Sequence, residues 1–355
     1  MTKIIKVITI IMISFLLTAC YDYKEVNSID IITGIGIDYQ DDEYITTLEV
    51  LKNTGDKTAI KLDTEIISGK GSSLSSSLVN ATNNLNKNPN YSHLKVMVLT
   101  KKALEAKWFS IMDFFLRNTD FRENFYVVIT NDLPIDIFNT KDSTTKVTSI
   151  LIANLFESQK YNVIDQKFED YTSDYLTFNK SLLFTNIDII NNKLTINGAT
   201  ILNNKLYDLS KEDLEVYNLF NNSNKKMVID SHYDNDVFSI VITNSNLKTS
   251  IKDNTILISG SINAKILNNE TNINIRNLKN IDMLNNDFKA IIENRINNLF
   301  KTIKNYNTDI FGIDNMNYQI NRKEIKNYWL NQDIKINIDF NIDKKGLIYE
   351  VDYEK

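Results

Sequence analysis

Few residues in this sequence are candidates for catalysis. The 355 residues include one cysteine, Cys20, and two histidines, His93 and His232. Neither histidine has a second histidine or a carboxylate at metal-ligand spacing, so the HExxH pattern of zinc hydrolases is absent from the sequence. The nucleophile elbow G-x-S-x-G and the phosphate-binding P-loop are absent from it as well. We therefore predict that the protein is not an enzyme and that it holds neither a metal nor a cofactor.

Both histidines have structural explanations. His93 precedes an apolar run, and we interpret it as a satisfied structural residue at the head of a buried strand. His232 stands between Ser231 and Tyr233-Asp234, a context typical of a turn. Carboxylate pairs such as Asp41-Asp42 are common in a chain with 45 acidic residues, and a solvated surface explains them.

Cys20 follows a short apolar run that begins after Lys3 and Lys6. The run is too short for the roughly 20 residues of a membrane-spanning helix, but it suits the apolar region of a secretory signal. Leu17-Thr18-Ala19-Cys20 resembles the bacterial lipobox. We expect residues 1–19 to be a signal peptide and Cys20 to carry the lipid, including palmitate-type acyl chains. The alternative is a signal-anchor helix with an incidental cysteine.

Lipid attachment at Cys20 would leave the mature chain without a thiol, which excludes disulfides, thiolate metal sites and cysteine nucleophiles. The formal net charge is −5, and no polybasic stretch follows the predicted anchor. Nucleic acid is therefore not an expected partner, and the lipid rather than surface charge would hold the protein at a membrane.

A glycine pair precedes an acid at Gly34-x-Gly36-x-Asp38. A nucleotide-binding loop would need a third glycine and a following helix, and the sequence has neither. Within a strand, such glycines more often permit a bulge or the close approach of another segment.

Arg117 and Arg122 bracket a short polar turn between a predicted helix end and a predicted strand. Arginines in that position can bind the carbonyl groups at the end of the helix, or they can bind acidic groups of a partner. The sequence leaves both alternatives open.

The first half of the chain alternates between strand and helix patterns. Apolar spacing predicts strands at residues 29–37, 44–51, 57–67, 93–99 and 125–130 and helices at 74–85, 101–116 and 147–158. We expect Ser72 or Ser73 to cap the first helix and Thr100 to cap the second. Residues 170–179 show no clear period. The order predicts a mixed sheet with crossover helices.

The second half is rich in strands and contains a long helix. Strands are predicted at residues 182–190, 194–202, 205–207, 227–230, 237–243, 255–263, 271–275 and 334–342, the last pairing with 347–351. A helix is predicted at 211–220, and a stripe from Phe288 to Ile303 predicts a long one. The predicted class is α+β or mixed α/β, with an N-terminal domain at residues 20–190 and a C-terminal domain at 191–355.

The start of the mature chain carries a specific run of residues. It reads Cys20-Tyr21-Asp22-Tyr23-Lys24-Glu25 and continues to the Gly34-x-Gly36-x-Asp38 strand. This order resembles the Ger(x)C family, the germinant-receptor C-subunit lipoproteins of spore-forming bacteria. In that family the lipidated cysteine is usually followed by Trp-Asp, a basic residue and Glu. Here Tyr21 stands for Trp and Lys24 for Arg, and both changes are conservative.

Later landmarks agree with the same family in order and spacing. They are Gly69-Lys-Gly-Ser-Ser73, Tyr91-Ser-His93, the helix end and turn from Asp113 to Arg122, Asn197-Gly-Ala-Thr200, and Asn307-Thr-Asp-Ile-Phe-Gly312 followed by Trp329. The resemblance covers essentially the whole mature chain.

The resemblance implies a non-enzymatic subunit of a spore germinant receptor, tethered to the outer face of the spore inner membrane. Its partners would be the integral-membrane A- and B-type subunits, and nutrient sensing and ion release belong to the complex. We expect partner binding at the strand with Gly34, Gly36 and Asp38, and at Arg117 and Arg122.

Two other classes of protein remain as alternatives. A solute-binding lipoprotein of a membrane transporter would share the anchor, but it usually has two similar lobes, whereas the halves of this chain differ. An envelope hydrolase would need a nucleophile or a metal constellation, which the sequence lacks.

Overall fold

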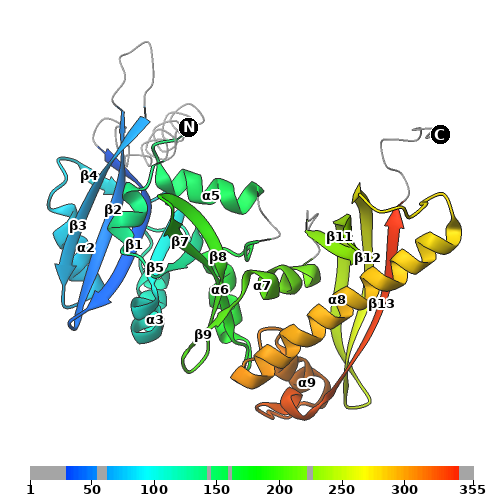
Figure 1. Cartoon of the computed structure of the whole chain (residues 1–355). Helices are drawn as coiled ribbons and strands as arrows, with labels where there is room; N and C mark the ends of the chain where they lie inside the picture. The colour runs from blue at the N-terminus through cyan, green and yellow to red at the C-terminus, as the bar shows by residue number, and fades with distance from the viewer. Residues whose placement is uncertain (1–28, 54–61, 142–144, 159–161, 222–226, 344–355) are drawn as a thin grey trace, which may run out of the picture.

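Two β-sheets with their helices make up the structure (Figure 1). The computed structural model describes residues 29–53, 62–141, 145–158, 162–221 and 227–343. The predicted signal peptide, Cys20 and the strand expected at residues 347–351 lie outside the described residues. The class is mixed α+β, as predicted.

The first sheet is mixed, and its parallel strands are at its centre. The order is β3-β2-β1-β5-β6-β7-β8-β9, and β4 pairs with β1. Neighbours among β1, β5, β6 and β7 are parallel, whereas β2 and β3 on one side and β8 and β9 on the other are antiparallel additions. The strands are Ile29–Gln40 (β1), Glu43–Asn53 (β2), Leu62–Gly71 (β3), Asn88–Asn90 (β4), Val96–Thr100 (β5), Tyr126–Thr130 (β6), Leu182–Ile190 (β7), Lys193–Leu202 (β8) and Leu206–Leu209 (β9).

Three hairpins turn on pairs of Asp and Asn residues, all with positive φ. The pairs are Asp41-Asp42, Asn191-Asn192 and Asp253-Asn254. Two successive positive φ angles match the twist of the flanking strands, and Asn and Asp adopt them more readily than other non-glycine residues. The second pair shows that the first sheet continues past residue 190, through β8 to β9.

Helices cover both faces of the first sheet. On one face, α2 (Leu74–Thr82), α3 (Lys101–Arg117) and α6 (Phe168–Leu176) contribute to a core with Ile35 and Ile37 of β1. On the other face, α4 (Pro134–Asn139) and α5 (Thr148–Ser158) contribute to a second core. Successive residues of β5 point to different cores, as the period of a strand requires: Met97 and Leu99 belong to the first core, and Val96 and Val98 belong to the second.

The predicted caps of α2 and α3 are confirmed. The Ser73 side chain accepts a hydrogen bond from the Ser76 amide, and the Ser76 side chain accepts one from the Ser73 amide. The Thr100 side chain accepts from the Ala103 amide. Each bond satisfies an amide that the first turn of a helix leaves without a partner.

The second sheet has the order β10-β11-β12-β13. Strands β12 and β13 are parallel, and the long helix α8 lies in the connection between them (Figure 1). The elements are α7 (Lys211–Tyr217), β10 (Val228–Tyr233), β11 (Asp236–Lys252), β12 (Thr255–Asn269), α8 (Leu278–Tyr306), α9 (Ile313–Asn321) and β13 (Asp333–Asp343). The apolar stripe of α8 is buried at Phe288, Ile292, Leu299 and Ile303, as its spacing predicts.

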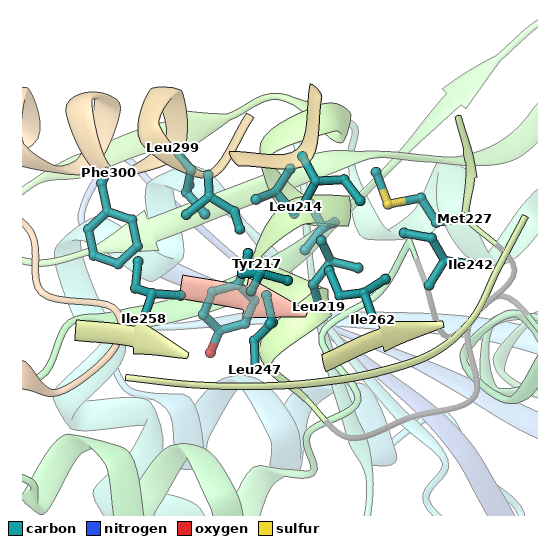
Figure 2. Packing of buried hydrophobic residues seen from close by; sticks show 14 of the residues in the cluster. Leu214, Tyr217, Leu219, Met227, Ile242, Leu247, Ile258, Ile262, Leu299 and Phe300 are labelled. Atoms are coloured by element: carbon teal, nitrogen blue, oxygen red, sulfur yellow. The ribbon is translucent and has the colours of Figure 1, made fainter. Parts of the chain in front are cut away.

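One apolar core joins the two sheets. It includes Ala199 and Ile201 of β8, Leu214 of α7 and the buried stripe of α8. Figure 2 shows Leu214 and neighbouring side chains of α7 meeting residues from the second sheet and from α8. Because this core draws on both halves of the chain, the two sheets pack as neighbours.

Several predicted elements need correction. Residues 271–275 form no strand, because β12 already extends to Asn269 and the chain then turns into α8. The sequence also missed α4, α6 and α9, which have six or nine residues each. In α6 the buried residues are Phe168 and Tyr171, too few to produce a readable period.

Candidate functional site

Gly34 and Gly36 lie inside the fold, under α4. A Cβ atom on Gly36 would stand 2.3 Å from Cβ of Pro134, and one on Gly34 would stand 2.6 Å from Cε1 of Phe138. The missing side chains allow the helix to approach the sheet closely, and the β1–β2 register shifts between Ile32 and Gly34. The sequence interpretation of close approach and an irregular strand is confirmed.

Asp38 is also buried, with 2% of its surface exposed. Its carboxylate accepts hydrogen bonds from the Tyr39 amide at 2.8 Å, from Gln40 Nε2 at 2.6 Å and from Thr100 Oγ1 at 2.6 Å. Since Thr100 caps α3, Asp38 ties the end of β1 to the start of that helix. The structure therefore places Gly34, Gly36 and Asp38 within the fold, where they contact other parts of the same chain.

Arg117 and Arg122 lie on the surface. Arg117 ends α3, its side chain is 79% exposed, and its Nε lies 2.8 Å from both carboxylate oxygens of Asp113, one turn earlier. Arg122 is exposed, and no hydrogen bond or ion pair to it is found among the described residues. The structure thus separates the expected partner-binding residues into a buried strand and an exposed helix end.

A hollow beside Arg117 was not visible in the sequence. It has a volume of about 700 Å³ and is open to solvent between the start of α2 and the outer side of α3. Arg117 and Lys107 line it together with Tyr44, Leu74 and Phe114. We call it the α2–α3 groove. The helical spacing of residues 107, 110, 114 and 117 predicts that they share one face of α3. The sequence does not predict that α2 lies beside this face, because the sheet determines how the two helices are placed.

Glu49 is a buried acid that the sequence analysis did not single out. It lies opposite Gly34 on β2 and is fully buried. Its carboxylate accepts hydrogen bonds from the backbone amides of Thr148 at 2.6 Å and Ser149 at 2.9 Å, at the start of α5. Burial raises the pKa of Glu49, while these hydrogen bonds act in the opposite direction. The residue caps a helix about 100 positions away in the chain, so it holds α5 on the sheet.

A buried polar cluster connects the two halves of the chain near α9. The Ser181 amide donates to the Asp309 carbonyl at 2.8 Å, and the Asp309 amide donates to Ser181 Oγ at 3.2 Å. Asp314 accepts hydrogen bonds from Asn179 Nδ2 and from the Trp329 amide. Burial raises the pKa of Asp309 to about 6. These bonds support the position of the C-terminal half against the loop before β7.

Both histidines lie on the surface. His93 is exposed in the turn before β5, so the interpretation of a residue at the head of a buried strand is wrong. His232 is exposed near the end of β10 rather than in a turn. Across the described ranges, no group of three or more His, Cys, Asp and Glu side chains is placed to hold a metal ion.

Comparison with known families decides the relationship. The family described as "Spore germination protein N-terminal domain" matches residues 22–189, and "Spore germination B3/ GerAC like, C-terminal" matches residues 197–346. The chain belongs to the GerAC-like spore germination proteins. The family therefore has a role in spore germination, and the comparisons give no indication of catalysis.

Individual relatives agree with this assignment. The chain is 31% identical to "Spore germination protein A3" of Bacillus subtilis (strain 168) over 264 residues, which is 70% of this chain and 69% of that protein. The solved structure "Crystal Structure of the GerBC protein" has a TM-score of 0.56 at 17% identity and covers 87% of this chain and 96% of that one. The GerAC-like sequence thus has a GerBC-like fold.

The family match favours the germination hypothesis over the transporter lipoprotein that the sequence left open. In the part of the chain that the structure describes, no helix is both long enough and apolar enough to cross a bilayer. Membership of a germinant-receptor subunit family nevertheless suggests association with a membrane.

Proposed function

We propose that this protein is the lipid-anchored C subunit of a spore germinant receptor. It acts by binding the integral-membrane A- and B-type subunits, without a catalytic step, on the outer face of the spore inner membrane. The observation that carries the proposal is the pair of family matches, which follow one another in the expected order from residue 22 to residue 346.

The proposed anchor is Cys20, which follows the lipobox-like residues Leu17-Thr18-Ala19. Eight residues separate it from Ile29, the first residue of β1. Nine steps of at most about 3.4 Å give a reach of roughly 31 Å, so a lipid on Cys20 would keep the folded part beside the bilayer. Membrane-embedded subunits with extramembrane loops would then be accessible.

The proposed partner surface is the exposed end of α3. Arg117 and Arg122 present planar, permanently charged guanidinium groups to solvent, and such groups recognise carboxylates through paired hydrogen bonds. Gly34, Gly36 and Asp38 support the surface only indirectly, because they are buried beneath α4 or bonded to Thr100.

Membrane fractionation of Cys20→Ser spores tests this proposal. The unacylated variant should move from the inner-membrane fraction to the soluble fraction, because the chain is acidic and has no polybasic segment after Cys20. His232→Gln, an exposed substitution on β10, serves as the control and should stay in the membrane.

The same spores provide a second readout. Affinity purification of the tagged wild-type protein should recover the A- and B-type subunits. Failure to recover either of them from detergent-solubilised wild-type membranes would contradict the proposed function. A Cys20→Ser protein that stays membrane-bound after a salt wash would show that protein contacts, rather than the lipid, hold it there.

A further inference from the structure

The α2–α3 groove is more basic than the rest of the chain would suggest. The whole sequence has a net charge of −5, yet the charged residues that line the groove are Lys107, Arg117 and Asp113. Asp113 already binds Nε of Arg117 through both of its oxygens at 2.8 Å. The remaining nitrogens of the Arg117 guanidinium stay available, because 79% of that side chain is exposed.

Lys107 lies over aromatic rings at the groove, and Asp42 acts on it only through its nearby charge. Its Nζ lies 4.5 Å from the ring centroid of Tyr39 and 6.0 Å from that of Tyr44. No ion pair joins Lys107 to a carboxylate within the described ranges. A cation over aromatic faces keeps its charge and its position, so Lys107 can attract an anion without first breaking a salt bridge.

The other walls suit a peptide. Leu74 and Tyr44 are buried and give the groove an apolar floor, while Ser72, Ser75 and Ser110 place hydroxyl groups at its rim. The start of α2 adds little by itself, because the Ser73 and Ser76 side chains already satisfy amides there. A volume of about 700 Å³ lies within the range of ligand sites, roughly 300–1,000 Å³, but the open shape suits an extended segment.

An apolar ridge continues from the groove along α3. Phe109 is 60% exposed and shares a helical face with Asp113 and Arg117, since the three are spaced four residues apart. The Phe109 ring lies 6.1 Å from the ring of Tyr175, beside Leu176, which is 78% exposed. Exposed aromatic and aliphatic side chains next to an arginine have the composition of interface hot spots.

We propose that the α2–α3 groove binds an acidic segment of a partner protein, and that an apolar side chain of that segment packs on Phe109. The carboxylates of the segment bind Lys107 and Arg117. This inference rests on the proposed function, because it takes the partner to be an extramembrane loop of an A- or B-type subunit. Complementary charge is the argument for this occupant: two basic side chains face one acid that is already engaged.

Charge reversal with a matched control tests the groove. Lys107→Glu with Arg117→Glu changes the two basic groups of the groove, and Lys102→Glu with Lys248→Glu makes the same charge change at exposed positions outside it. Tagged variants are purified from solubilised spore membranes, and the A- and B-type subunits are quantified. The groove variant should lose about tenfold or more of the co-purified subunits, whereas the control should stay within about twofold of wild type.

A neutral variant separates electrostatics from shape. Lys107→Gln with Arg117→Gln should give an intermediate loss, because it removes attraction without adding repulsion. Unchanged melting temperatures of all three variants would show that folding is not the cause.

Equal recovery of the subunits by the groove variant and by wild type would contradict binding at the groove while leaving the proposed function intact. Loss in the Lys102 and Lys248 control alone, or equal loss in both variants, would also contradict that binding. Absence of the subunits from the wild-type purification would instead contradict the proposed function itself.

Discussion

Strand β1 and the end of α3 both carry residues expected to bind a partner, but the residues of β1 are buried and those of α3 are exposed. Gly34 and Gly36 of β1 lie under α4, at positions where even a Cβ atom has no room. Arg117 of α3 is 79% exposed, and its ion pair is with its own helix. The distinctive glycine motif of β1 is thus explained by close packing within the fold. The residues that a partner can contact lie in the less distinctive turn after α3.

The largest expected effect comes from filling the space above β1. Gly36→Val should lower the free energy of unfolding by about 3 kcal/mol or more, because its side chain overlaps Pro134 in a packed core. Urea denaturation measures this change. The partner-binding residues on α3 should remain intact in the fraction that folds.

A second substitution tests whether the overlap is the cause. Pro134→Gly removes the Cβ atom that lies 2.3 Å from the position a Cβ would take on Gly36. In a double-mutant cycle, Gly36→Ala should cost less when Pro134 is Gly than when it is Pro. If Gly36→Ala leaves stability unchanged but abolishes co-purification of the membrane subunits, β1 is an interface and the comparison with α3 fails.

The next effect concerns Asp309, whose pKa is raised by burial to about 6 from an ordinary value of 3.8. Because the folded form binds the proton more tightly, this group stabilises the fold most below pH 3.8, and that stability is lost as the pH rises through 6. Two pKa units correspond to about 2 to 3 kcal/mol.

Asp309→Asn removes this titration. The free energy of unfolding of the wild type, measured relative to that of Asp309→Asn, should therefore decrease as the pH rises from 4 to 7.5. Chemical denaturation at a series of pH values measures this difference. The contributions of the other acids cancel, because both proteins contain them. A difference that is independent of pH would show that Asp309 is already ionised in the fold, as an exposed carboxylate would be.

The smallest effect on stability is expected at the exposed helix end. Arg117→Glu should leave the free energy of unfolding nearly unchanged, because exposed ion pairs contribute little. The same variant should reduce co-purification of the A- and B-type subunits. Thermal denaturation and the purification together check the prediction, and a large loss of stability would remove the distinction between the two regions.

Local chemistry made much of the fold predictable from the sequence. The Ser73 and Thr100 caps, the stripe of α8 and the strands of the first sheet follow from spacing and residue type. Contacts between segments that are distant in the sequence could not be predicted in this way. Glu49 caps α5 from about 100 residues away, and Pro134 lies over Gly36, because the sheet brings them together.

The candidate site shows the same limit. Arg117 was identified from its position beside a turn, but Lys107 and the α2 serines were not connected with it. Their proximity depends on how α2 and α3 lie on the sheet, which no local pattern records. Short helices such as α6 were missed because two buried residues are too few to show a helical period in the sequence.

Photo-crosslinking in intact spores tests the central claim most directly. A photoreactive residue replaces Leu116, next to Arg117 on α3, or Val228 on β10; these side chains are similarly exposed, at 40% and 46%. The account predicts crosslinks to the A- or B-type membrane subunits from position 116 and few from position 228. Crosslinks to those subunits from position 228 with none from position 116 would place the partner on the second sheet and contradict it.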